Sequence, residues 1–183
     1  DVYKRQTRGK ERAMWEEVTS TLAEEFSSLP DAAEVTRVMV RLLLAALLGG
    51  IVGYEREHKG KAAGLRTHML VAMGAALFVL VPERGGMGIA DMSRVIQGVV
   101  AGVGFLGAGA IIKRHSEEQV QGLTTAAGIW MTAAIGVACG LGREAIALLA
   151  TLLAIVILVM LPHVVSAPPP QADAEPDTKP RET

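Results

Sequence analysis

Residues 42–53 read L-L-L-A-A-L-L-G-G-I-V-G and residues 70–81 read L-V-A-M-G-A-A-L-F-V-L-V, and neither run contains a charge. Residues 55–67, E-R-E-H-K-G-K-A-A-G-L-R-T, lie between them and carry seven ionisable side chains. The pattern predicts two apolar helices joined by a short charged link. A link of this kind acts either as a topology signal or as a functional site.

The composition is typical of a helical membrane protein. The chain has 183 residues, of which 50% are hydrophobic and 20 are glycine, and its mean hydropathy is +0.35. These values favour one transmembrane domain whose main partner is the lipid bilayer. A net charge of −1 argues against nucleic-acid binding. The single cysteine, Cys139, excludes an internal disulfide and a cysteine-based zinc site.

Five charge-poor segments punctuated by charged links predict the transmembrane domain, residues 31–162. The fold class is therefore expected to be all-α: a polytopic membrane helical bundle of about five transmembrane helices, preceded by an N-terminal amphipathic helix. The expected spans are Ala32–Tyr54, Leu65–Val81 (closed by Pro82), Val95–Ile112, Leu123–Leu141 and Ala145–Leu161. Asp31 and Glu34 fit a capping box at the start of the first span.

The two ends of the chain read differently from the bundle. Residues 1–13 resemble a fragment end or a cloning remnant, with Met14 as the start of the natural chain. Residues 14–30 repeat apolar side chains every three or four positions, which predicts an amphipathic helix packed on the domain; binding to the membrane surface is the alternative. Residues 163–183 are rich in proline and lack apolar periodicity, which predicts a disordered tail.

The first span must include two arginines, Arg37 and Arg41, because its charge-free part of 12 residues is too short to cross the hydrocarbon core. We expect both to snorkel to the interface. The alternative is that Arg41 points into the bundle and meets an acidic partner.

Lysine and arginine in the links predict the orientation. The first and third links share a side with the C-terminus and hold six such residues, against three in the second and fourth links. The C-terminus is therefore expected in the cytoplasm, although Arg37 and Arg41 count against this orientation.

Three G-x-x-x-G pairs predict close helix packing, because small residues let helix backbones approach each other. The pairs are Gly49 and Gly53, Gly98 and Gly102, and Gly136 and Gly140. The pattern does not separate packing within the chain from the seam of a homo-oligomer.

Four stretches together resemble one known family. They are residues 53–57 and 61–78 around the charged link, S-R-V-I-Q-G-V-V-A-G-V-G-F-L-G-A-G at 93–109, and Q-G-L-T-T-A-A-G-I-W-M-T-A-A-I-G-V-A-C-G-L-G at 121–142. This combination resembles the transmembrane domain of the MgtC/SapB family, and the likeness extends over roughly residues 35–161.

The resemblance implies a multi-pass protein of the bacterial inner membrane that is involved in magnesium transport or homeostasis. The alternative is a non-transporting regulator that docks on another membrane protein, such as a P-type ATPase or the ATP synthase. Longer members carry an ACT-like cytoplasmic domain after the last span, whereas only 21 residues follow Pro162 here. The chain is therefore expected to be a short form without that domain.

The charged link supplies the first candidate site residues: Glu55, Arg56, Lys61, Arg66 and Thr67. They could form a polar cluster at the membrane boundary or hold a hydrated ion, or the cations could merely set the topology. Three neighbours, Glu57, His58 and Lys59, are expected to be a solvated loop.

The third and fourth spans add Asp91, Arg94, Thr124 and Thr125 to the candidate site. Asp91 or Ser93 is expected to cap the third span, although Asp91 and Arg94 could instead pair with polar ends of other helices. Thr124 and Thr125 are expected to pack in the core or to bond to neighbouring helices.

No metal site can be assigned from the sequence. Mg²⁺ prefers convergent oxygen ligands, and no Asp or Glu lies inside an expected span. Three histidines, His68, His115 and His163, are scattered and lack metal-ligand spacing. No cofactor is expected, and Mg²⁺ is left as ligand or transported ion. The chain also lacks a nucleophile–base pair and a phosphate-binding loop, so we do not expect an enzyme.

Overall fold

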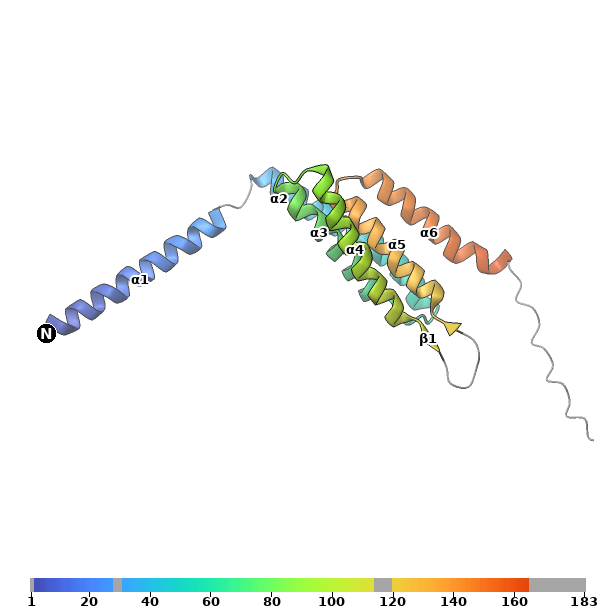
Figure 1. Cartoon of the computed structure of the whole chain (residues 1–183), viewed down its shortest axis with the longest axis horizontal. Coiled ribbons are helices and arrows are strands. Elements are labelled where there is room, and N and C mark those ends of the chain that lie inside the picture. Colours follow the sequence, from blue (N-terminus) through green and yellow to red (C-terminus); the bar gives the residue numbers. More distant parts are fainter. Residues whose placement is uncertain (1, 28–30, 114–119, 165–183) are drawn as a thin grey trace, which may run out of the picture.

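The computed structural model describes residues 2–27, 31–113 and 120–164, and it confirms the all-α fold class. Figure 1 shows a helical bundle with one helix, α1, projecting away from it. The helices in the described ranges are α1 (Val2–Ser27), α2 (Ala32–His58), α3 (Leu65–Arg84), α4 (Ile89–Ala110), α5 (Leu123–Gly140) and α6 (Glu144–Val164). A two-residue antiparallel pair, β1 (Ile112–Lys113) with β2 (Val120–Gln121), closes the link between α4 and α5.

Helices α2 to α6 are the five in the described ranges that are long and apolar enough to cross a membrane. The shortest, α5, has 18 residues, which span about 27 Å at 1.5 Å per residue. This length is close to the hydrocarbon thickness of a bilayer. Alternating helix directions place the start of α2 at the same end of the bundle as the end of α3, and the end of α2 beside the start of α3.

Two predicted boundaries were wrong around the link between α3 and α4. Pro82 lies inside the last turn of α3 instead of closing it, and the helix continues to Arg84. Proline lacks one N–H donor, and the helix continues for only two residues beyond it. The turn follows at Gly85 and Gly86, where Gly86 has a φ of +76°. Helix α4 then begins at Ile89, six residues before the predicted start at Val95.

Both outer helices differ from expectation, and α6 continues past Leu161 to Val164. Helix α1 starts at Val2, within residues 1–13, which were interpreted as a fragment end or cloning remnant. It extends away from the bundle (Figure 1). Its apolar side chains Trp15, Val18 and Leu22 are exposed, so the predicted packing of this helix on the domain is wrong. The predicted tail lies outside the described residues from 165 onward.

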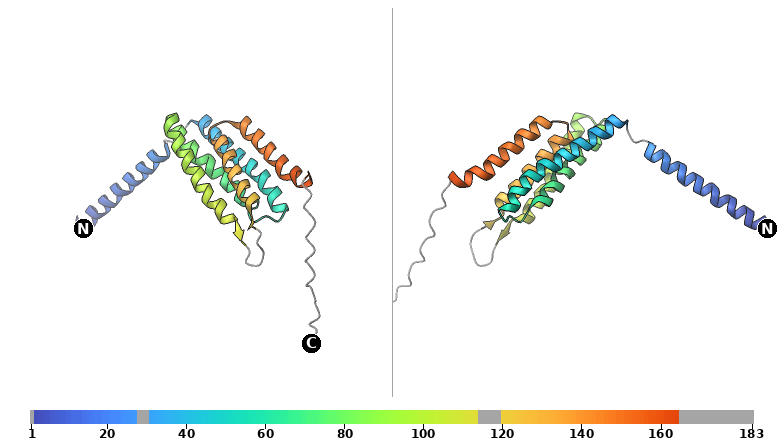
Figure 2. Two further views of the ribbon diagram at one scale, coloured as in Figure 1. Left: turned by 45° about the vertical axis from the view of Figure 1, so that its right-hand side comes forward. Right: turned by 180° about the vertical axis from the view of Figure 1, so that it is seen from behind.

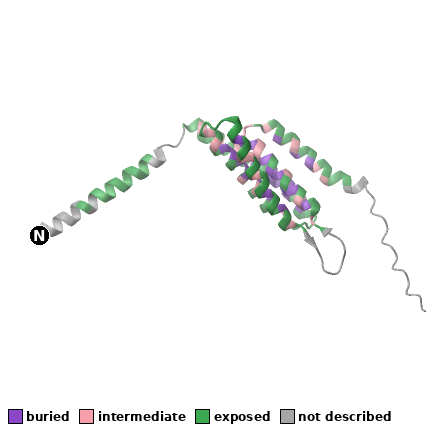
Figure 3. Ribbon diagram, in the orientation of Figure 1, coloured by how far each residue is buried: buried purple, intermediate pink, exposed green. Residues whose placement is uncertain are grey.

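Helix α5 is the centre of the bundle and contacts each of the other four membrane helices. Its buried side chains Ile135 and Cys139 meet Leu48 and Val52 of α2, and small residues of α3 and α6 complete this core. Figure 3 shows the buried residues where α2, α3 and α5 meet, with exposed residues over α4 and α6. Figure 2 (left) places α4 and α6 at opposite edges of the bundle.

Glycines set the spacing of α3 from its two neighbours. On α2, a methyl group at Gly49 would lie 2.6 Å from the His68 carbonyl oxygen, and one at Gly53 would lie 2.8 Å from the Cα of Leu65. On α5, methyl groups at Gly136 and Gly140 would overlap the carbonyls of Ala72 and Ala76. Two of the three G-x-x-x-G pairs therefore lie where backbones approach most closely.

The third pair, Gly98 and Gly102 on α4, is placed differently. A methyl group at either position would meet no atom within 4 Å in the described chain. Nothing in this fold therefore requires glycine at these two positions.

The contact at Gly136 can be tested with a single methyl group. Gly136→Ala should lower the free energy of unfolding by about 1–3 kcal/mol, because the added atom forces α5 away from the Ala72 carbonyl. Thermal unfolding of the purified protein in detergent would measure the loss. The matched control is Gly104→Ala on α4, where a methyl group has open space. Equal stability of the two variants would contradict this account of the α3–α5 contact.

Candidate functional site

An ion cluster around the buried Arg56 occupies the end of the bundle where α2 leads into α3. Arg56 is only 2% exposed, and its Nε donates a hydrogen bond to Oε2 of Glu55. The other oxygen of Glu55, Oε1, lies 2.9 Å from Nζ of Lys59. Lys59 also donates to the carbonyl oxygen of Leu158 on α6, at 2.9 Å. One carboxylate thus lies between two cations, and the cluster joins the end of α2 to the end of α6.

Glu57 performs a structural role that the sequence did not reveal. Its Oε2 accepts a hydrogen bond from the backbone N–H of Leu65 at 2.7 Å, which satisfies one of the free donors at the start of α3. Gly64 makes room for this carboxylate, because a methyl group there would lie 2.6 Å from Oε2. Glu57 and Lys59 are exposed as expected, but the predicted loop is wrong, because α2 continues to His58 and both side chains make the contacts described above. His58 is exposed and stacks on Tyr54.

His68 is the functional candidate that sequence reasoning missed. Its side chain is fully buried, and its Nδ1 donates to the carbonyl oxygen of Gly64 at 3.0 Å. Its Nε2 faces Gly128 of α5, where a built methyl group would lie 3.5 Å from that nitrogen and 4.0 Å from Cδ of Arg56. Within the described chain, Nε2 has no hydrogen-bond partner. The spacing of His68, Ala72 and Ala76 by four residues marks the inner face of α3 and could have identified it.

The structure brings together only part of the predicted cluster. Glu55 and Arg56 are joined, and Thr125 is buried one turn before Gly128 on α5. The other members from the charged link and from the start of α5 are exposed: Lys61, Arg66, Thr67 and Thr124. Arg66 and Thr67 follow Leu65 in the first turn of α3, so their side chains leave the face that carries His68. A cluster of Glu55 with Arg66 is therefore not formed.

Asp91 and Arg94 lie at the opposite end of the bundle from Glu55. They are 61% and 82% exposed, and Nη1 of Arg94 is 3.7 Å from Oδ1 of Asp91 on the same helix. Neither expected role is found, because Gly88 occupies the N-cap position of α4 and the Ser93 hydroxyl donates to the Ala90 carbonyl. Their charges thus face outward from the described chain.

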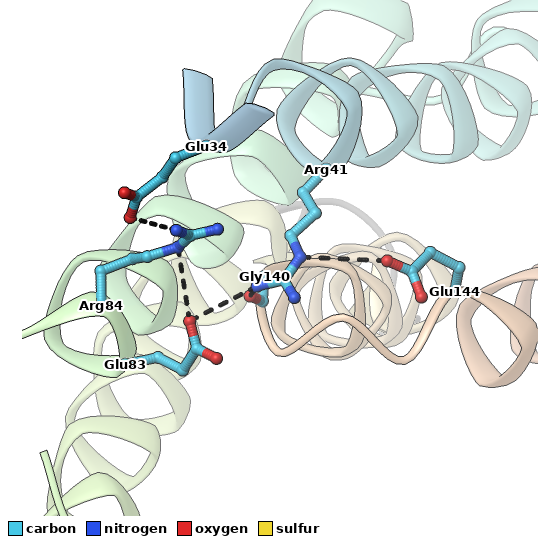
Figure 4. A network of polar contacts seen from close by, with 6 residues as sticks. All are labelled: Glu34, Arg41, Glu83, Arg84, Gly140 and Glu144. Carbon is cyan, nitrogen blue, oxygen red and sulfur yellow. Dashed lines mark hydrogen bonds and ion pairs between the residues drawn. The ribbon is translucent and has the colours of Figure 1, made fainter. Parts of the chain in front are cut away.

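A second ion network holds this opposite end together (Figure 4). Arg41 donates from Nη1 to the Gly140 carbonyl oxygen at 3.0 Å, and the same nitrogen is 3.4 Å from Oε2 of Glu83. Its Nε lies 3.9 Å from Glu144. With 13% of its side chain exposed, Arg41 points into the bundle rather than snorkelling. The expected snorkelling of Arg41 is therefore wrong and the alternative is correct, because α2 begins nine residues before Arg41 and places its side chain against the ends of α3 and α5.

Arg84 extends the same network to the start of α2. It pairs with Glu34, and its Nε lies 3.8 Å from Glu83 (Figure 4). The predicted capping box is therefore not formed: Glu34 is engaged by Arg84, and the Asp31 side chain makes no capping hydrogen bond. Four helices, α2, α3, α5 and α6, meet in this network.

Comparison with known proteins identifies the family. A model of the MgtC family matches residues 42–167, more than half of the chain and nearly all of the bundle. The chain belongs to the MgtC family. The glycine contacts and both ion networks fall within or beside the matched region, so they describe how this member of the MgtC family is built.

Several curated relatives are similar over the same region. The chain is 49% identical over 122 residues to "Protein SrpB" of Synechococcus elongatus, covering 61% of this chain and 67% of that protein. It is 43% identical over 127 residues to the "Putative magnesium transporter YhiD" of Escherichia coli K12, covering 66% and 58%. It is 45% identical over 117 residues to "Protein MgtC" of Brucella abortus, covering 64% and 48%.

These matches have a defined extent. The matched region spans about half to two thirds of the length of the relatives named above. No solved structure matches the chain. Family membership and the five apolar helices together make this a multi-pass membrane protein.

The role of Arg41 can be tested by truncation. Arg41→Ala should lower the free energy of unfolding by about 2 kcal/mol, because the Gly140 carbonyl and two carboxylates lose a charged hydrogen-bonding partner. Arg37→Ala, an exposed arginine one turn earlier on α2, should change it by less than about 0.5 kcal/mol. Denaturation in mixed micelles would compare them, and equal losses would remove the special role of Arg41.

Proposed function

We propose that this chain is an inner-membrane component of magnesium homeostasis that acts by docking on another membrane protein rather than by conducting Mg²⁺. The link to magnesium rests on family membership and on the E. coli relative whose name is "Putative magnesium transporter YhiD". The choice of docking over conduction rests on the charges that this chain places inside the bundle.

The buried guanidinium of Arg56 carries the proposal. A divalent cation crossing the membrane needs oxygen ligands that replace its hydration water. The most buried carboxylate at this end, Glu55, is instead neutralised by Arg56 and Lys59. A positive charge that is 2% exposed also repels Mg²⁺ strongly in a medium of low dielectric constant. The cluster is therefore suited to holding helices together and unsuited to passing a cation.

The packing of α5 against α3 supports the same conclusion. At Gly136 and Gly140 the two backbones are in direct contact, which leaves no space for a hydrated ion between these helices. At the opposite end, Glu83 and Glu34 are paired with Arg41 and Arg84. Within the described ranges, no three His, Cys, Asp or Glu residues converge to hold a metal.

The paired charges and the close helix contacts of the described bundle support docking over conduction. A membrane protein that influences magnesium without conducting it must act through a protein that moves ions or spends ATP. The contacts available for this are helix–helix contacts within the bilayer, which depend on close packing and interhelical hydrogen bonds.

Paired measurements in vesicles and in cells test this function. Purified wild-type protein in lipid vesicles with an internal magnesium dye should give the same Mg²⁺ entry as protein-free vesicles, because Arg56 blocks cation passage. The same chain should restore magnesium-limited growth to a bacterial host that lacks its own MgtC-family protein. Arg56→Ala should lose this growth, whereas Arg66→Ala, with an exposed arginine, should retain it.

The vesicle experiment has a decisive contrary outcome. Mg²⁺ entry above the protein-free level that Glu55→Gln abolishes and Arg66→Ala retains would establish transport and overturn docking. Vesicles that hold a known magnesium channel verify the dye response, and circular dichroism verifies that each variant is folded.

The orientation is a separate proposal. The end of the bundle with Lys59 and Lys61 is proposed to face the cytoplasm together with the end of α6, by the excess of cations in the links on this side. In spheroplasts of a Cys139→Ala background, a membrane-impermeant thiol reagent should label Arg143→Cys and spare Lys61→Cys; both native residues are exposed. The reverse labelling pattern would invert the topology.

A further inference from the structure

An apolar groove lies between α3 and α4 on the lipid-facing side of the bundle. Its volume is about 580 Å³, and it is lined by Leu70, Gly74 and Phe78 of α3 and by Gly98, Gly102 and Leu106 of α4, among others. Helix α4 forms the edge of the bundle and is the least buried of the five membrane helices, with 11% of its apolar window buried (Figure 2). This groove has no role in the ion clusters described above.

Small residues shape this groove for a helix. Gly98 and Gly102 lie four residues apart on α4, and neither meets a neighbour within 4 Å of a built methyl group. Elsewhere in the bundle, the Gly49–Gly53 and Gly136–Gly140 pairs are filled by the backbone of α3. A backbone that approaches Gly98 and Gly102 in the same way gains close packing that flexible lipid chains do not supply.

Charges at one end of the groove indicate which helix packs against Gly98 and Gly102. Asp91, Arg94, Gly98 and Gly102 follow one another at spacings of three, four and four residues, so they share one side of α4. Asp91 and Arg94 carry opposite charges and are both largely exposed. A two-fold axis along the membrane normal would place Asp91 of one copy beside Arg94 of the other, and the reverse. This side of α4 is thus complementary in charge to the same side of α4 in a second copy.

We propose that this surface is a homodimer seam: α4 of one copy crosses α4 of a second copy at Gly98 and Gly102, which line the groove, and Asp91 and Arg94 form reciprocal ion pairs between the copies. Phe78 and Leu106 at the walls of the groove then pack on the second copy instead of on lipid. This inference concerns assembly, goes beyond the proposed function, and does not depend on whether the chain conducts magnesium.

The association of the full chain in lipid vesicles tests the seam. Fluorescence energy transfer between two labelled populations, measured over a range of protein-to-lipid ratios, should show a saturable dimer. Gly98→Ile should weaken dimerisation about tenfold or more, because the side chain holds the backbones apart. The matched control is Gly104→Ile on the same helix but on another side, where a methyl group also meets nothing within 4 Å; it should leave the dimer unchanged.

Charge reversal tests the ion pairs independently of the glycines. Asp91→Arg makes this end of α4 doubly positive, and Arg94→Asp makes it doubly negative. Each variant alone should dimerise about tenfold more weakly than wild type because like charges meet across the seam. A mixture of the two variants should associate as well as wild type, since opposite charges then face each other. If Asp91 and Arg94 pair only within one chain, the mixture would dimerise no more strongly than either variant alone.

Cross-linking identifies the face directly. In a Cys139→Ala background, Phe105→Cys should form a disulfide-linked dimer on oxidation, because Phe105 is 81% exposed and lies one turn beyond Gly102 on the same side. Ile146→Cys on α6, also exposed, should not.

Any of four results would overturn the seam: a wild-type chain that stays monomeric, a different protein co-purifying in the groove of a monomer, equal effects of Gly98→Ile and Gly104→Ile, or cross-linking at Ile146→Cys in place of Phe105→Cys.

Discussion

The close approach of the α3 backbone to α2 and α5 is the constraint on which the rest of the structure depends. Apolar side chains do not drive helices together in a bilayer, because lipid is as apolar as they are. Glycine at positions 49, 53, 136 and 140 instead brings backbones into direct contact with α3. Once α3 is held between α2 and α5, His68 is enclosed and Gly128 faces its ring. The burial of Arg56 follows from the same contact.

Ion networks at the two ends complement this glycine-based packing. A buried charge is costly unless it is paired. The buried Arg56 is paired with a carboxylate, and the partly buried Arg41 with carboxylates and a backbone carbonyl. Arg41 joins the ends of α3 and α5 to the start of α6, while Glu55 and Lys59 join the end of α2 to the end of α6. These directional contacts define the register of helices that otherwise pack through small, smooth surfaces. In the described bundle, the charges at both ends thus connect one helix to another.

Helix α4 is the exception to this arrangement. It contributes few buried residues, and its glycine pair meets nothing within the described chain. Its exposed Asp91 and Arg94 also take no part in either network. The same kinds of feature, small residues and paired charges, join the other helices within one chain. Their presence on an outer face is the physical basis for assigning that face to contacts between chains.

The sequence by itself determined the all-α class, the five apolar helices and the family, because these depend on local composition, on spacing along the chain and on motifs. It also identified Glu55 and Arg56, since charges beside an apolar run stand out without any knowledge of their partners. Only the tertiary structure decided which residues meet. Arg41 points inward because Gly140, Glu83 and Glu144 lie at the same end of the bundle. These partners are 42 or more residues away in the chain, so the sequence did not reveal them. The spacing of His68, Ala72 and Ala76 places His68 on the inner face of α3, but its neighbours, Arg56 on α2 and Gly128 on α5, are known only from the tertiary structure.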